Sequence, residues 1–210
     1  MRLCLALSLL LLFPELALAQ GATAFQGFYV GLGGGWVAMN VKAQRTGQEQ
    51  TSASADDDAW QGAFFLGNGV RWGWLHLGVE AELGSRSVDV RLSDSERLSG
   101  SSYWGARLRL GGVFREQTMP YAALGVRFSS FRYQRDGYQA LDGGSRLNNG
   151  PTLAAGLEQV LFERLLLRVE YCSTRWNDLE VDFYGPDQEV SRLTLKPESR
   201  EATLALIWAF

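Results

Sequence analysis

Residues 75–86, LHLGVEAELGSR, alternate strictly between apolar and polar side chains. The apolar set is Leu75, Leu77, Val79, Ala81 and Leu83, and the intervening positions are polar or glycine. This alternation predicts a β-strand with one apolar face. In a water-soluble protein that face would cover a core. In a narrow membrane barrel it would face lipid, and the small and acidic residues would face the lumen. The rest of the chain must decide between these two arrangements.

The first 19 residues have the features of a secretory signal peptide. A basic residue precedes an apolar run at 3–13, and Ala17-Leu18-Ala19 forms a small-residue cleavage site. The run is too short for a membrane helix and is interrupted by Pro14 and Glu15. We therefore expect a signal peptide at residues 1–19, a single domain at residues 20–210, and export from the cytoplasm.

Composition points to an all-β chain and excludes several classes. The formal net charge is -3 and no basic patch dominates, which argues against nucleic-acid binding. No apolar run after the signal reaches the ~18 residues of a membrane helix. Glycine is abundant, at 24 residues, and tryptophan and tyrosine number 7 each. Cys4 would be lost with the signal, so Cys172 would have no disulfide partner in the chain.

Alternating segments recur about eight times, and their connections are alternately long and short. The segments are 28–38, 60–72, 75–86, 103–114, 121–133, 153–161, 165–176 and 201–210. The polar stretches 39–58, 87–101, 134–150 and 177–197 are expected as long loops, the last containing a hairpin. A soluble sandwich has no reason to alternate connection length in this way. The sequence therefore predicts an eight-stranded antiparallel transmembrane β-barrel with short periplasmic turns and long extracellular loops.

Aromatic residues near the ends of these segments fit two girdles at the membrane interfaces, although core packing is the alternative. They are Trp36, Trp60, Trp72, Trp74, Trp104, Tyr121, Trp176 and Trp208.

The segments 28–36, 75–83, 120–126 and 156–171, together with the terminal Phe210, resemble the OmpA-like, opacity-type family of small outer-membrane β-barrels. The resemblance implies an eight-stranded barrel in the outer membrane of a Gram-negative bacterium. It also implies that the barrel-assembly machinery reads the terminal phenylalanine and the alternate apolar residues before it, here Leu206, Trp208 and Phe210. It implies little about activity, because members range from structural proteins to adhesins and serum-resistance factors.

The charged residues on the predicted inner face are the main candidate site. Opposed residue numbers in an antiparallel hairpin have a constant sum, so one register can pair Glu80 with Arg109 and Glu82 with Arg107. Glu158 and Arg168 can meet across a short turn. Side chains just fill an eight-stranded barrel, so we expect an ion-paired plug. A gated proton or ion path is the alternative.

His76, the only histidine, has no serine beside it in sequence, which argues against a lipid-A-modifying hydrolase or acyltransferase. Asp56-Asp57-Asp58 lacks the regular spacing of a metal site and is expected as solvated charge. Cys172 is expected as a small buried lumenal residue. We therefore assign no catalytic, cofactor-binding or metal-binding residue.

The predicted function is structural or surface-interacting, with binding or adhesion through the exposed loops. A lipid-A-modifying enzyme and a narrow channel remain as alternatives. The expected partners are outer-membrane lipid and lipopolysaccharide, the barrel-assembly machinery and a surface ligand, with no nucleic acid.

Overall fold

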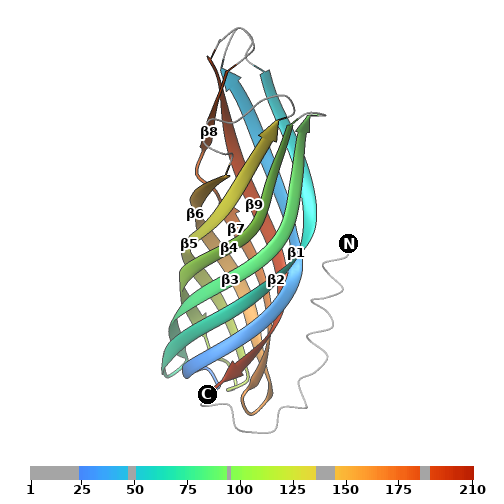
Figure 1. The fold of residues 1–210 in the computed structure, drawn as a ribbon. Helices are drawn as coiled ribbons and strands as arrows, with labels where there is room; N and C mark the ends of the chain where they lie inside the picture. Colours follow the sequence, from blue (N-terminus) through green and yellow to red (C-terminus); the bar gives the residue numbers. More distant parts are fainter. Residues whose placement is uncertain (1–23, 47–50, 94–95, 136–144, 185–189) are drawn as a thin grey trace.

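A computed structural model describes residues 24–46, 51–93, 96–135, 145–184 and 190–210, and the expected signal peptide lies outside them. The described strands form one antiparallel sheet that closes on itself, because β9 pairs with β1. Figure 1 shows a tall barrel of tilted strands. The strands are β1 (Gly27–Thr46), β2 (Thr51–Trp72), β3 (Leu75–Ser93), β4 (Glu96–Gly112), β5 (Thr118–Arg135), β6 (Ser145–Phe162), β7 (Leu165–Arg175), β8 (Leu179–Tyr184) and β9 (Val190–Ala209).

The barrel is eight strands in circumference, because β7 and β8 lie one after the other along the same partner strand, β9. The break between them lies opposite Pro197. The N–H of Trp176 donates to the carbonyl of Pro197 at 3.1 Å, but proline has no N–H to donate in return. The β8–β9 pairing confirms the hairpin expected within residues 177–197.

The strands run further than the sequence predicted. Much of each polar stretch expected as a loop is paired sheet: β1 continues to Thr46 and its partner β2 begins at Thr51. In the same way, β3 reaches Ser93 and β4 starts at Glu96. The expected boundaries at 39–58 and 87–101 were therefore wrong, as were those at 134–150 and 177–197, where β6 begins at Ser145 and β9 at Val190.

An apolar cluster inside the extended part of the barrel explains these longer strands. Met39, Val41 and Ala43 alternate with polar residues and point inward. They pack in one buried cluster with Val90, Leu98, Phe131, Trp176, Leu193 and Leu195. The polar residues between them made the stretch look like loop, whereas the period of two is that of a strand with one buried face.

The expected orientation of the polar and apolar faces is confirmed on β3. Glu80 and Glu82 are buried inside the barrel, and Val79 and Leu83 are exposed on its outer wall. The apolar face thus lies outside and the charged face inside, the reverse of a water-soluble protein.

Candidate functional site

The buried charges of β3 and β4 lie together inside the barrel, but in a different register from the one expected. Glu80 pairs with Arg107 rather than Arg109, and Glu82 lies opposite Gly105. The register is offset because irregularities interrupt the β3–β4 ladder between Ser85 and Val88 and again near Ser93. Sequence alone does not locate such bulges, so the expected register was wrong by two residues.

Long arginine side chains nevertheless bring the expected partners within reach of each other. Arg109 Nη1 lies 3.3 Å from Glu80 Oε2, and Arg107 Nη1 lies 3.7 Å from Glu82 Oε2. Arg107 Nη2 lies closer to its register partner, at 2.5 Å from Glu80 Oε1. Each arginine therefore bridges more than one carboxylate.

Glu158 and Arg168 are direct cross-strand neighbours on β6 and β7, as the short turn predicted. Arg168 Nε donates to Glu158 Oε1 at 2.7 Å. Arg168 also reaches across the lumen to Glu80, with its Nη2 at 2.8 Å from Oε2. Arg109 approaches the same Glu158 carboxylate at 2.7 Å, so these four residues form one group.

Four further charges belong to the network and were not among the expected site residues. Glu170 accepts two hydrogen bonds from Arg107, at 2.7 and 2.8 Å. Arg127 binds Glu82 at 2.5 Å and Glu201 at 2.7 Å. Arg86 approaches Glu201 at 3.3 Å. All four occupy inward positions of their strands, so the same alternation that identified Glu80 could have identified them.

The buried charges of the described chain balance. The group contains five glutamates and five arginines, each at most 3% exposed: Glu80, Glu82, Glu158, Glu170, Glu201, Arg86, Arg107, Arg109, Arg127 and Arg168. Confined charges are stable only when paired and hydrogen-bonded. As a whole, this set of ten residues is paired, because its five negative charges match its five positive charges.

Aromatic residues complete the network. The Tyr29 hydroxyl donates to Glu80 Oε2 at 2.6 Å, and the Tyr121 hydroxyl donates to Glu170. The Arg109 guanidinium lies 4.1 Å from the centre of the Tyr121 ring, and Arg168 lies 4.9 Å from that of Phe65. These rings provide favourable surfaces for the guanidinium groups.

His76 is buried at the short-turn end of the barrel, where its ring fills the space beside Gly69. A small cavity of about 10 Å³ adjoins it, lined in part by Tyr29, Arg109 and Glu158 and by no serine. The nucleophile that an acyl-transfer site requires is therefore not beside the histidine in this part of the chain. No group of three or more histidine, cysteine or acidic side chains among the described residues could hold a metal ion.

Cys172 is buried, with its Sγ 3.0 Å from the Thr152 hydroxyl, in agreement with the expected lumenal position.

A family model for the outer-membrane protein β-barrel domain matches residues 4–194. The chain belongs to this family. The 25 kDa outer-membrane immunogenic protein of Brucella canis is 28% identical over 172 residues, which cover 82% of this chain and 72% of the relative. The protein of the same description from Brucella abortus is 27% identical over the same shares. These matches place the chain in the outer membrane of a Gram-negative bacterium.

A solved structure supports the fold of this family member. The outer-membrane protein OprG of Pseudomonas aeruginosa superimposes with a TM-score of 0.61 at 13% identity, over 88% of this chain and 97% of OprG. At this identity the likeness shows the shared barrel architecture and carries no further functional information.

The outer wall of this outer-membrane barrel carries its aromatic residues at two levels. Trp36 and Trp60 pack edge to face at 5.5 Å, and Trp104 stacks on Phe128 at 4.2 Å. Trp72, Trp74, Trp208 and Phe210 are exposed near the short-turn end. Two residues expected in the girdles face inward instead. Tyr121 binds the lumenal charges, and Trp176 packs in the buried apolar cluster that contains Met39 and Val41.

Trp36 also indicates where along β1 the outer membrane boundary lies. It is the midpoint of β1, and the strand continues through residues 37–46 beyond it. The residues from Phe28 to Trp36 match the length of a tilted membrane-crossing strand, about 9–11 residues. The upper half of β1 therefore stands outside the membrane.

The described chain contains no helix long and apolar enough to cross a membrane.

Proposed function

We propose that this outer-membrane barrel is a structural and surface-interaction protein whose lumen is closed by its ion pairs. The observation that supports this is the balanced network of five glutamates and five arginines, which joins β3, β4, β5, β6, β7 and β9 across the interior. Apolar clusters lie around it and above it. A path for hydrated ions would have to break these contacts.

Conductance across planar lipid bilayers tests the closed lumen. The purified protein should show no steady single-channel conductance. Glu82→Ala leaves Arg127 without one carboxylate partner and should lower thermal stability. Steady conductance of the unchanged protein, or a Glu82→Ala variant with unchanged stability and raised conductance, would favour the narrow channel instead.

The surface role belongs to the part of the wall beyond the aromatic girdle. Its outer face carries exposed polar residues such as Lys42, Asp56, Asp58 and Arg97, suited to lipopolysaccharide head groups or to a surface ligand. Cells producing a barrel shortened by removal of residues 41–55 should bind lipopolysaccharide or the surface ligand less than cells with the full barrel. The shortened barrel should still show heat-modifiable mobility in gels. Undiminished binding by cells with the shortened barrel would contradict this assignment.

A lipid-A-modifying activity is the alternative that has least support, because His76 lies inside the barrel. Incubation with lipid A should leave its acyl chains unchanged. Turnover that Glu82→Ala retains and His76→Ala abolishes would replace the surface role with catalysis.

The end of β9 supports an assembly signal. Leu206, Trp208 and Phe210 face outward on one side of the strand, and the Phe210 N–H donates to the Phe28 carbonyl at 2.9 Å. Phe210→Ala should slow insertion of the barrel into the outer membrane of cells. It should have little effect on refolding in detergent, where the barrel-assembly machinery is absent. Equal slowing in both settings would indicate a purely structural role.

A further inference from the structure

Residues 24–26, which immediately precede β1, turn inward at the short-turn end of the barrel. Ala24 and Phe25 are only 6% and 3% exposed, although they belong to no strand. The chain changes direction at Gly27, whose φ of 92° is rarely adopted by residues with a side chain. Residues 24–26, called the N-terminal turn below, therefore lie inside the barrel rather than along its wall.

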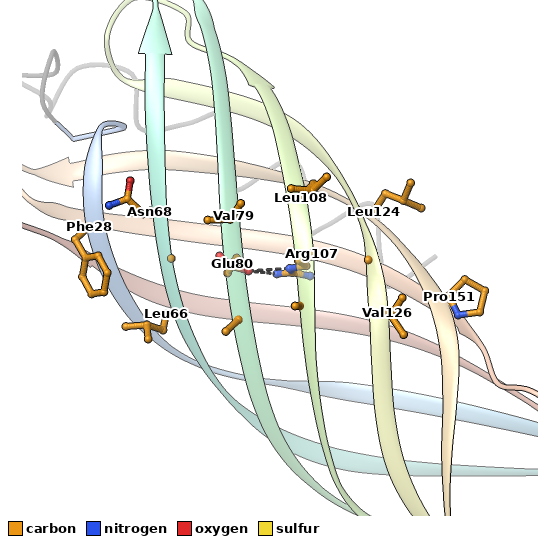
Figure 2. A pocket seen from close by; sticks show the side chains of 14 residues that line it. Phe28, Leu66, Asn68, Val79, Glu80, Arg107, Leu108, Leu124, Val126 and Pro151 are labelled. Atoms are coloured by element: carbon orange, nitrogen blue, oxygen red, sulfur yellow. Dashed lines mark hydrogen bonds and ion pairs between the residues drawn. The ribbon is translucent and has the colours of Figure 1, made fainter.

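Phe25 packs on the lumenal side of the sheet. It belongs to the buried apolar cluster that contains Leu166, Ile207 and Ala209. Phe28, the first outward residue of β1, is 47% exposed and lies on the outer wall (Figure 2). The rings of Phe25 and Phe28 therefore lie on opposite sides of the sheet, and only Phe28 faces lipid.

A cavity of about 10 Å³ adjoins both the N-terminal turn and the lower part of the ion network. Residues 24–27 line it, together with His76, Arg109 and Glu158. Such a volume holds about one water molecule. His76 Nδ1 is buried beside this cavity without a hydrogen-bond partner in the described chain. The space between the turn and these polar groups is therefore too small for a continuous column of water.

The N-terminal turn is held in place by apolar packing. Among the described residues, no hydrogen bond or ion pair joins residues 24–26 to the wall. The strands around the turn are held by ladders of backbone hydrogen bonds. Segments with few hydrogen bonds and few buried side chains open more readily than such strands. The turn can therefore leave the lumen while the barrel stays folded.

We propose that the N-terminal turn is a plug that closes the short-turn end of the lumen and controls the access of water to His76. The inference rests on the closed lumen proposed above, since a plug at one end has no purpose in an open pore. It adds a second barrier of a different kind. Ion pairs close the middle of the lumen, and an apolar segment that can move closes its lower end.

The rate at which His76 is acylated by diethyl pyrocarbonate tests the plug, because His76 is the only histidine in the chain. The protein must carry no histidine tag, and peptide mass spectrometry identifies the modified residue. Phe25→Ala should accelerate the reaction by about 10- to 100-fold, because it removes the apolar burial that favours the closed turn. Phe25→Leu keeps an apolar side chain and should react more slowly than Phe25→Ala.

Phe131→Ala is the matched control. Phe131 is 2% exposed, against 3% for Phe25, and lies in the other buried apolar cluster, with Met39 and Val41. The same chemical change is thus made inside the barrel but away from the short-turn end. Phe131→Ala should leave the rate of His76 acylation nearly unchanged. Heat-modifiable mobility verifies that each variant is folded.

Equal acylation rates in the unchanged protein and in Phe25→Ala would overturn the plug. Equal acceleration by Phe25→Ala and Phe131→Ala would overturn it as well, because it would show a general loosening of the barrel. If Phe25→Ala does not fold, the comparison of Phe25→Leu with the unchanged protein decides the question, and unaltered protection of His76 would then count against the plug.

Conductance across planar lipid bilayers separates this inference from the proposed function. Phe25→Ala should show no steady conductance, because its ion network is intact. Steady conductance of Phe25→Ala, together with faster acylation of His76, would support the plug and contradict closure of the lumen by ion pairs.

Discussion

Arg107 on β4 and Glu170 on β7 form a bidentate ion pair across the lumen, with hydrogen bonds of 2.7 and 2.8 Å. The two strands are not neighbours in the wall. The pair therefore ties opposite parts of the barrel together, which backbone pairing alone does not do. Paired hydrogen bonds between a guanidinium and a carboxylate are among the strongest side-chain contacts.

Arg107→Met should therefore destabilise the barrel strongly. The substitution leaves Glu80 and Glu170 buried with fewer positive partners, and breaking a buried pair costs about 3–5 kcal/mol. Guanidinium-induced unfolding in detergent, followed by tryptophan fluorescence, measures the change in the free energy of unfolding. Arg97→Met is the control, because the Arg97 side chain is half exposed and lies 3.9 Å from Asp89. Its effect should stay below about 1 kcal/mol, and equal losses would contradict the role of burial.

Glu158 and Arg168 should show strong energetic coupling. In a double-mutant cycle with Glu158→Gln and Arg168→Met, the double variant should be less destabilised than the sum of the single changes, because each single change strands the other charge. We expect a coupling free energy of about 0.5–3 kcal/mol from thermal or denaturant unfolding. Strictly additive effects would mean that Arg109 and Glu80 compensate for the loss.

Gly125 on β5 should not tolerate a side chain. A Cβ at this position would lie 2.2 Å from the Ala106 carbonyl oxygen and 2.5 Å from Arg107 Cβ. Gly125→Ala should cost about 1–3 kcal/mol, because the backbone must move to relieve the contact. Gly62→Ala is the matched control, since a Cβ there meets no atom within 4 Å. Similar unfolding midpoints for the two variants would show that β4 and β5 separate easily.

The turn between β4 and β5 provides a pH-dependent contact outside the membrane. Arg71 binds Glu116 through two hydrogen bonds, and this contact lowers the pKa of the Glu116 carboxyl. The stabilising contribution is thus present above the pKa of the unfolded chain and is lost as the pH falls through the lower folded value. Carbon-detected NMR titration should show the Glu116 pKa rise in Arg71→Gln. Arg115→Gln, in the same turn, should leave it nearly unchanged, and an equal rise in both would indicate a general charge effect.

The sequence was sufficient to predict the closed eight-stranded barrel. The alternation of apolar and polar side chains along each strand indicates which side faces lipid and which faces the lumen. It also identified the inward charges on β3, β4, β6 and β7. It did not predict the strand ends. Asn40 and Lys42 are polar, so the stretch beyond Trp36 looked like loop, although Met39 and Val41 already showed the alternation of a buried face.

The partners within the lumen were less accessible to sequence reasoning. Cross-strand neighbours such as Glu158 and Arg168 follow from a short turn, but Glu80 and Arg107 depend on bulges that lie further up the hairpin. Contacts across the lumen, as between Arg107 and Glu170, depend on the closure of the whole sheet. The inward position of Trp176, by contrast, follows from the sequence, because Trp176 continues the inward series of Cys172 and Thr174.

The position of Trp36 halfway along β1 determines what kind of surface the wall beyond it offers to a large probe such as an antibody fragment. The wall above it is built from neighbours that are distant in the chain, such as Asn40 and Asp56, which are hydrogen-bonded to each other. An antibody footprint on that wall would cover residues from several strands at once. Such a binding surface exists only in the folded barrel, so short synthetic peptides from one strand would compete poorly with it.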